Sequence, residues 1–393
     1  MVNYDVLFAI IFYAVIIILF LKYRNKFEVQ AKIFVMYRTK LGLRLMDYLS
    51  KKIPRILKVF SFTGVVVGFA GMAYITYFII RYTLKFIFIP GTEPPLAPVL
   101  PGVSIPGAPP LSFWHWIIAI LILAVIHEFS HGVIARLYNI KVKSSGFAFL
   151  GPILAAFVEP EEKEVIKKPR RVQMEMFAAG PFSNIVLAFI VLLLLTFVVT
   201  PFVDEKAHVQ GLKVMGFKEN FSTTDIQKGD IILGVNNVDI INEKFSVFFD
   251  EIKNKVDNEI TLKIKDSTSS AIKSIKTKVL PSKEDPKTGT IGLFVKGVYD
   301  TKGRALVWLW LLTVWLFIAN LGVGLFNLLP LGPVDGGRMF STAVSYFIKD
   351  NKKAKKITNT VSFVLLALIV INLLPFVYKL LVFVIKPIIS LLV

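Results

Sequence analysis

The chain has 393 residues, 55% of them hydrophobic, which excludes an ordinary soluble globular protein and indicates a polytopic membrane protein. It contains no cysteine, so disulfides, thiolate nucleophiles and Cys-ligated metals are excluded, and any metal site must use His, Asp or Glu. The formal charge is +19, but no aromatic-basic binding pattern accompanies it, and we therefore expect no nucleic-acid partner.

Apolar runs near the ~20 residues that a helix needs to cross a bilayer predict the membrane spans. In chain order they are 6–21, about 59–80, about 111–137, 176–199, about 306–329 and about 357–374. The first lacks a basic leader and a cleavage site, which favours a retained anchor over a signal peptide. The tail after Pro375 is either the end of the sixth span or a seventh span, because Lys379 and Lys386 interrupt its apolar character.

Basic residues gather in three loops beside these spans, namely 22–58, 139–173 and 349–356. Threading the spans alternately through the bilayer places all three loops on one side, and the positive-inside rule makes that side cytoplasmic. The N-terminus is then expected outside. The proline-rich segment 89–110 predicts a stiff extracytoplasmic connector.

Residues 203–303 carry dense charges of nearly balanced sign and no long apolar run, which predicts a soluble domain outside the membrane. GDIILGVNNVDI (229–240) reads as strand, turn and strand, FSVFFDEIKNK (245–255) as a helix and EITLKIK (259–265) as a strand. This order resembles a PDZ domain, although VQGLKVMGF (209–217) matches the recognition loop only loosely. The domain either binds an extended peptide or C-terminus, or is a small α/β spacer.

The third span contains HEFSH, which fits the pattern H-E-x-x-H. On a helix the i,i+4 spacing places His127 and His131 on one face, able to share one Zn²⁺, with Glu128 beside the metal as a proton acceptor. The alternative is a pair of buried histidines satisfied by neighbouring polar groups. Three ionisable residues in hydrocarbon need a compensating partner, and a divalent cation supplies it.

A catalytic zinc ion takes three protein ligands and a water. Asp335, in FNLLPLGPVDGGR (326–338), is the carboxylate that we expect to be the third ligand. The surrounding Pro and Gly residues predict a broken helix, which membranes tolerate only around a protein-lined or wet cavity. The alternative is a helix-terminating loop with a solvated Asp335.

H-E-x-x-H in one span and N-x-x-P-x-x-x-x-D-G-G in a later one resemble the site-2 protease family of intramembrane zinc metalloproteases, and so does an inserted PDZ-like domain. The resemblance covers about 111–348. It implies that His127, His131 and Asp335 bind zinc and that Glu128 is the general base. Asn327 matches a family position that holds the substrate backbone, and Asn184 lies in a G-P-x-x-N element (180–184) and is expected to contact substrate.

The sequence departs from the family pattern at two places. Ser130 stands where many members have Gly, and Gly332 with Val334 replaces a more usual Pro and Leu. These departures concern subfamily and substrate shape, since no proposed ligand is lost. After the third span, residues 144–164 predict either a membrane-dipping β element or a plain re-entrant loop; in the family, a strand here can pair with unfolded substrate.

We therefore expect a mainly α polytopic membrane protein of about six or seven spans with an inserted α+β PDZ-like extracytoplasmic domain. The expected parts are an N-terminal two-span region (1–110), the first part of a protease core (111–202) and the PDZ-like domain (203–303). The second part of the core (304–348) and the C-terminal span or spans (349–393) follow.

The expected function is cleavage of single-span transmembrane substrates within the lipid bilayer, with one Zn²⁺ as cofactor and the active site towards the cytoplasm. Three rivals remain open. One is a membrane zinc protease whose third ligand is a glutamate, for which Glu159, Glu161 and Glu175 are the candidates. The others are a zinc transporter, disfavoured because the first, second and sixth spans lack acidic and His residues, and a non-catalytic PDZ-bearing adaptor, disfavoured by the intact Glu128.

Overall fold

The computed structural model describes residues 4–30, 34–103, 105, 107–150, 153–218, 225–282 and 285–392. The chain divides into two compact units, one formed by residues 1–192 with 314–393 and the other by residues 193–313. Among the described residues, six helices are long and apolar enough to cross a membrane, which confirms the polytopic architecture. They are α1 (Tyr4–Lys22), α3 (Pro54–Phe88), α4 (Phe113–Leu137), α6 (Arg170–Leu194), α9 (Thr301–Phe326) and α11 (Asn351–Leu392).

Two of these helices differ from the expected spans. Helix α6 continues through a π-helical turn, η2 (Leu195–Val199), into α7 (Thr200–Lys206), so the fourth span is longer than its apolar run. Helix α11 passes through Pro375 without interruption. The tail after Pro375 is therefore the end of the sixth helix, and no separate span forms there.

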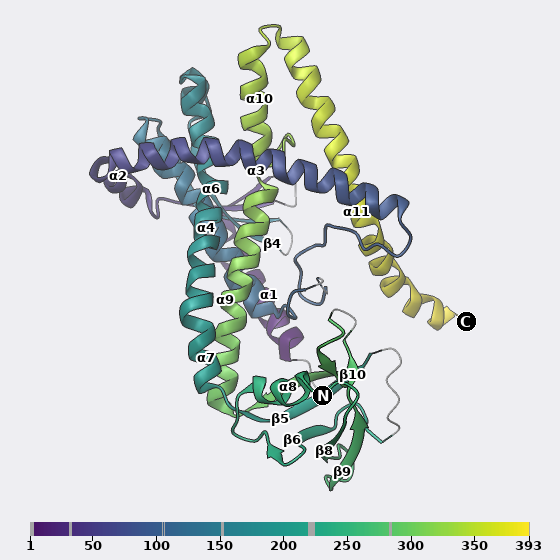
Figure 1. The fold of residues 1–393 in the computed structure, drawn as a ribbon. Coiled ribbons are helices and arrows are strands. Elements are labelled where there is room, and N and C mark those ends of the chain that lie inside the picture. The colour runs from purple at the N-terminus through teal and green to yellow at the C-terminus, as the bar shows by residue number, and fades with distance from the viewer. Residues whose placement is uncertain are drawn as a thin grey trace. The chain divides into compact units, whose positions relative to one another are not determined.

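Three helices of the larger unit, α4, α6 and α9, pack side by side (Figure 1). Ala119 and Leu123 of α4 form one buried cluster with Ala319 of α9. A Cβ at Gly324 of α9 would lie 3.2 Å from the carbonyl oxygen of Pro181 on α6. Small residues at these positions let the helix backbones approach closely, as is common in membranes.

A four-stranded antiparallel sheet completes the larger unit, with the strand order β1-β2-β3-β4. Its strands are β1 (Phe27–Gln30), β2 (Phe34–Thr39), β3 (Val142–Leu150) and β4 (Ile153–Pro160). The expected β element after the third span is thus a hairpin, β3–β4. The first two strands and the helix α2 (Leu43–Lys52) lie inside the basic loop 22–58, where no element was predicted. Two short helical turns, η1 (Arg24–Lys26) and α5 (Glu162–Lys167), flank the sheet in sequence.

The hairpin β3–β4 runs back along α4. Leu154 of β4 packs on the cluster around Phe113 and Trp116 at the start of α4, whereas Val158, further along the same strand, contacts Glu128. Strand β4 has β3 on one side, and its other edge has no strand partner among the described residues. The edge of a sheet therefore lies directly beside the H-E-x-x-H turn.

The expected helix break is present between α9, which ends at Phe326, and α10 (Asp335–Phe347). The amide of Gly336 donates to the carbonyl of Asn327 at 2.7 Å. A Cβ at Gly336 would lie 2.2 Å from the backbone of Leu328, so only glycine permits this close approach. The loop after α9 therefore packs against the first residues of α10, and this contact fixes the position of Asp335.

The smaller unit contains a sheet of order β12-β5-β6-β8-β9, with β7 paired to β6, and a separate pair β10–β11. Its elements are β5 (Val209–Phe217), β6 (Ile231–Val235), β7 (Val238–Asp239), α8 (Phe245–Lys253), β8 (Glu259–Lys265), β9 (Ile272–Lys278), β10 (Leu280–Pro281), β11 (Gly289–Thr290) and β12 (Leu293–Tyr299). Leu212, Ile232, Phe248 and Ile264 belong to its buried core.

The predicted strands and helix of this domain are present, and the turn at Asn236 has the positive φ of 53° that the Asn-Asn pair favours. Segment 209–217, the loose match to a recognition loop, is instead the interior strand β5, paired with both β12 and β6. On the β6 side the register covers only Leu212 and Lys213. An inserted α+β domain is thus established, whereas its assignment as PDZ-like stays a prediction.

Candidate metal centre

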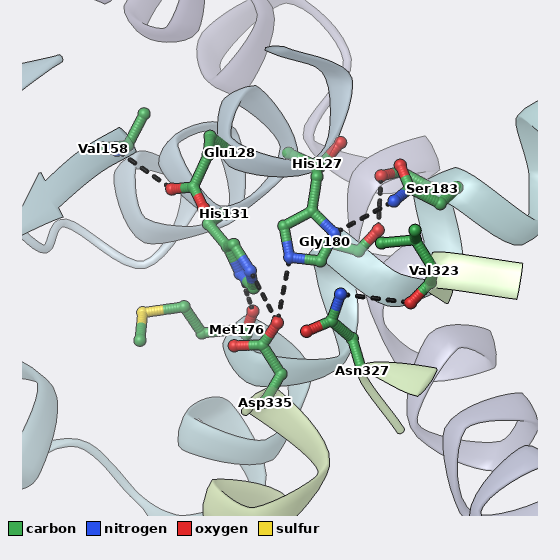
Figure 2. Close-up of polar contacts among 12 residues, drawn as sticks. His127, Glu128, His131, Val158, Met176, Gly180, Ser183, Val323, Asn327 and Asp335 are labelled. Atoms are coloured by element: carbon green, nitrogen blue, oxygen red, sulfur yellow. Dashed lines mark hydrogen bonds and ion pairs between the residues drawn. The ribbon is translucent and has the colours of Figure 1, made fainter. Parts of the chain in front are cut away.

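His127, His131 and Asp335 lie together although more than 200 residues separate the histidines from the aspartate. The Oδ2 atom of Asp335 is 3.0 Å from Nε2 of His127 and 3.2 Å from Nε2 of His131. Figure 2 shows both imidazoles, one helical turn apart on α4, directed at this carboxylate. The three side chains expose only 10% to 15% of their surface.

These three residues suit a tetrahedral metal ion. In a zinc site with bonds of about 2.0–2.1 Å, neighbouring ligand atoms lie roughly 3.3 Å apart, close to the spacing of the two nitrogens from the oxygen. Burial alone raises the pKa of Asp335, which follows the membrane helix α9, but the facing His131 and His127 lower it more strongly. The net pKa of Asp335 lies below its ordinary value, which favours the ionised carboxylate that a metal ligand requires.

Gly180 of α6 leaves the space that such an ion needs. A Cβ at this position would lie 2.4 Å from Nε2 of His131 and 2.6 Å from Nε2 of His127. Any side chain would therefore stand against the two nitrogens that face Asp335. The G-P-x-x-N element was singled out from the sequence, but this use of its glycine was not predicted.

The other ring nitrogens of the two histidines also have partners. Nδ1 of His131 lies 2.8 Å from the carbonyl oxygen of Met176, to which a ring N–H can donate. Nδ1 of His127 lies 3.2 Å from Nδ2 of Asn184, which is completely buried. Both partners are on α6. The Met176 contact could not be predicted from the sequence, because any residue type can supply a backbone carbonyl.

Glu128 lies beside this group on α4, and its Oε2 atom accepts a hydrogen bond of 2.9 Å from the amide of Val158 on β4 (Figure 2). Glu128 and the three residues of the His–His–Asp group line one cavity of about 320 Å³. The walls also include Val158, Pro160, Met176, Phe177, Asn327, Pro333, Val334 and Arg338. The cavity can hold a water and part of a peptide next to both the carboxylate of Glu128 and the His–His–Asp group.

The two predicted substrate contacts lie in different surroundings. Asn327 lines the cavity beside Asp335, and its Nδ2 donates to the carbonyl of Val323 at 3.1 Å (Figure 2). Asn184 is buried behind His127. Asn327 is therefore placed to meet a molecule in the cavity, whereas Asn184 meets an imidazole.

The glutamates considered as alternative ligands have other partners. Glu175 is completely buried and accepts hydrogen bonds from Ser61 at 2.7 Å and from Tyr138. Glu159 pairs with Arg38, and Glu161 forms an ion pair of 3.0 Å with Lys143. The geometry thus favours Asp335 over all three as the third ligand.

Comparison with known proteins places these features in a context. Residues 115–376 match the model of peptidase family M50. An uncharacterized protein of Methanocaldococcus jannaschii is 33% identical over 329 residues, covering 81% of this chain and 80% of that protein. Among solved structures, the PDZ domain of the SdrC-like protein from Listeria monocytogenes has 22% identity and a TM-score of 0.20, covering 23% of this chain and 92% of that one.

Proposed function

The chain belongs to peptidase family M50, the site-2 protease family, and is thus a membrane-embedded metalloprotease; we propose that it cleaves peptide bonds within transmembrane helices of other membrane proteins and uses one zinc ion to do so. The observation that carries the proposal is the His127–His131–Asp335 group, which shares one cavity with Glu128.

In this proposal His127, His131 and Asp335 hold the zinc ion. When bound, zinc supplies Lewis acidity, which polarises the scissile carbonyl and lets water lose a proton near neutral pH. Glu128 takes that proton as the water oxygen bonds to the carbonyl carbon. It then delivers the proton to the amide nitrogen as the C–N bond breaks. Asn327, on the cavity wall beside Asp335, donates a hydrogen bond to the substrate backbone or to the developing oxyanion.

The substrate is a transmembrane helix that unwinds locally, because an intact helix hides its carbonyls in hydrogen bonds. The edge of β4 that pairs with no described strand offers a partner for the unwound segment, since β4 contributes Val158 and Pro160 to the cavity. Adding an extended strand there would bring its backbone beside Glu128. Single-span membrane proteins in the lipid bilayer are accordingly the proposed substrates.

The active site is proposed to open towards the cytoplasm. Strand β2 comes from loop 22–58 and pairs with β3 from loop 139–173, which supports a common side for both loops. These are loops that the positive-inside rule assigns to the cytoplasm. Cleavage would then release a cytosolic fragment. The inserted domain would be extracytoplasmic, where a PDZ-like domain could screen substrates by size or by a free C-terminus.

The test is cleavage of single-span substrates by the purified protein, with and without a zinc chelator, beside a Glu128→Gln variant. The wild type should cut only when zinc is present, and Glu128→Gln should bind zinc without cutting. Cleavage by Glu128→Gln would refute the role of Glu128. Zinc binding without any cleavage by the wild type would instead favour a non-catalytic adaptor.

A further inference from the structure

The completely buried Asn184 has a polar atom that no group satisfies. Its Nδ2 faces Nδ1 of His127 at 3.2 Å, while its Oδ1 has no hydrogen-bond partner among the described residues. An unsatisfied buried acceptor is destabilising, and a leucine of similar size would avoid this cost. The amide of Asn184 faces a histidine of the proposed metal centre, which points to a role there.

The chemistry of an imidazole ligand identifies that role. A neutral histidine that binds a metal through Nε2 carries its proton on Nδ1, and this N–H needs an acceptor. For His131 the acceptor is present, because Nδ1 lies 2.8 Å from the carbonyl of Met176. For His127 the group at Nδ1 is the side chain of Asn184, and the atom that faces the ring is Nδ2, a donor.

The present orientation fits the other tautomer of His127. With the proton on Nε2, the ring can donate to Oδ2 of Asp335 at 3.0 Å, and the lone pair on Nδ1 can accept from Nδ2 of Asn184. This arrangement gives both ring nitrogens of His127 a partner. It cannot persist when a metal takes the place of the Nε2 proton, because two N–H groups would then face each other.

We propose that Asn184 is a positioning residue for His127: its Oδ1 accepts the Nδ1 proton of the tautomer that binds zinc, and its Nδ2 donates to Nδ1 of the other tautomer. A half-turn of the amide about its last side-chain bond exchanges the nitrogen and the oxygen with little change of shape. The same half-turn gives the orphaned Oδ1 its partner. The inference rests on the proposed function only in requiring that the centre binds zinc.

This role differs from the substrate contact expected from the sequence. It uses the ability of a carboxamide to serve both tautomers, since this group has a donor and an acceptor on the same carbon. Aspartate at this position can only accept, and it would favour the tautomer that binds metal. Leucine can do neither, and it would leave the Nδ1 proton of bound His127 without an acceptor.

The experiment measures the zinc affinity of the purified full-length chain by competition with a chelator, for wild type, Asn184→Leu and Asn184→Asp. Asn320→Leu is the matched control, because Asn320 is also completely buried with an unpartnered Oδ1, but its Nδ2 donates to the carbonyl of Leu316 in its own helix. The thermal stability of each metal-free protein is recorded beside the affinity.

Asn184→Leu should weaken zinc binding about 10- to 100-fold, the usual effect of losing such a partner, while Asn184→Asp and Asn320→Leu stay close to wild type. Equal affinity in Asn184→Leu and wild type would overturn the inference and leave Asn184 as a substrate or packing residue. An equal loss in Asn184→Asp and Asn184→Leu would also overturn it. Whether the wild-type protein binds zinc at all is a separate test of the proposed metal centre.

Discussion

Replacing Gly180 by alanine places a new methyl group directly against both histidines of the metal centre. The new Cβ would lie 2.4 Å from Nε2 of His131, which is 1.0 Å shorter than the 3.4 Å at which ordinary van der Waals contact begins. It would lie 2.6 Å from Nε2 of His127 as well. Relief requires both imidazoles to move away from Asp335, or α6 to move away from α4.

Forcing an extra methyl group into a packed site costs about 1–3 kcal/mol. If that cost falls on the metal-bound arrangement, zinc binding weakens by roughly 5- to 150-fold, at 1.4 kcal/mol for each factor of ten. We expect a loss in this range for Gly180→Ala, measured as the zinc dissociation constant by chelator competition, together with loss of substrate cleavage.

Gly322→Ala is the matched control. Gly322 is an exposed glycine of helix α9, and a Cβ there meets nothing within 4 Å. The control should bind zinc as the wild type does. Wild-type zinc affinity in Gly180→Ala would refute the close approach of α6 to the imidazoles, and with it the account of why this helix carries a glycine.

Three further predictions concern the base, the rival ligand and the topology. Val158→Pro removes the amide that donates to Glu128, and because hydrogen bonds to charged groups contribute about 1.5–3 kcal/mol, cleavage should slow roughly 10- to 150-fold. Val158→Ala keeps the amide and should cleave normally; equal rates in both variants would contradict the contact. Glu175→Gln should lower the melting temperature, since its buried network loses a charged acceptor, yet leave zinc stoichiometry unchanged. Loss of zinc in a folded Glu175→Gln protein would revive the rival ligand. Because the chain has no cysteine, an impermeant maleimide should label Thr268→Cys, but not Lys353→Cys, in intact cells; the reverse pattern would invert the proposed topology.

The sequence predicted those features that depend on residue type repeated at regular spacing. Long apolar runs located the six helices, and the i,i+4 pair His127 and His131 implied a metal that required a distant carboxylate. The glycine and proline residues around Asp335 predicted the helix break that brings it there. In each case the physical requirement acts on residues close together in the sequence and so determines their type and spacing.

Other features depend on what surrounds a residue, and these were missed. Strands β1 and β2 are short and lie among charges, and they are stabilised by partners such as Glu159, which bonds Arg38 from 121 residues away. Gly180 contributes by having no side chain, and Met176 contributes only its carbonyl. Asn184 was expected to contact substrate, and only the fold places it against His127.

The central claim is that one zinc ion is shared by His127, His131 and Asp335. Anomalous diffraction at the zinc edge from crystals of the purified protein tests it directly. The account predicts a single anomalous peak between the two Nε2 atoms and the carboxylate of Asp335. A peak ligated by a glutamate in place of Asp335, or no peak in zinc-saturated crystals, would contradict it.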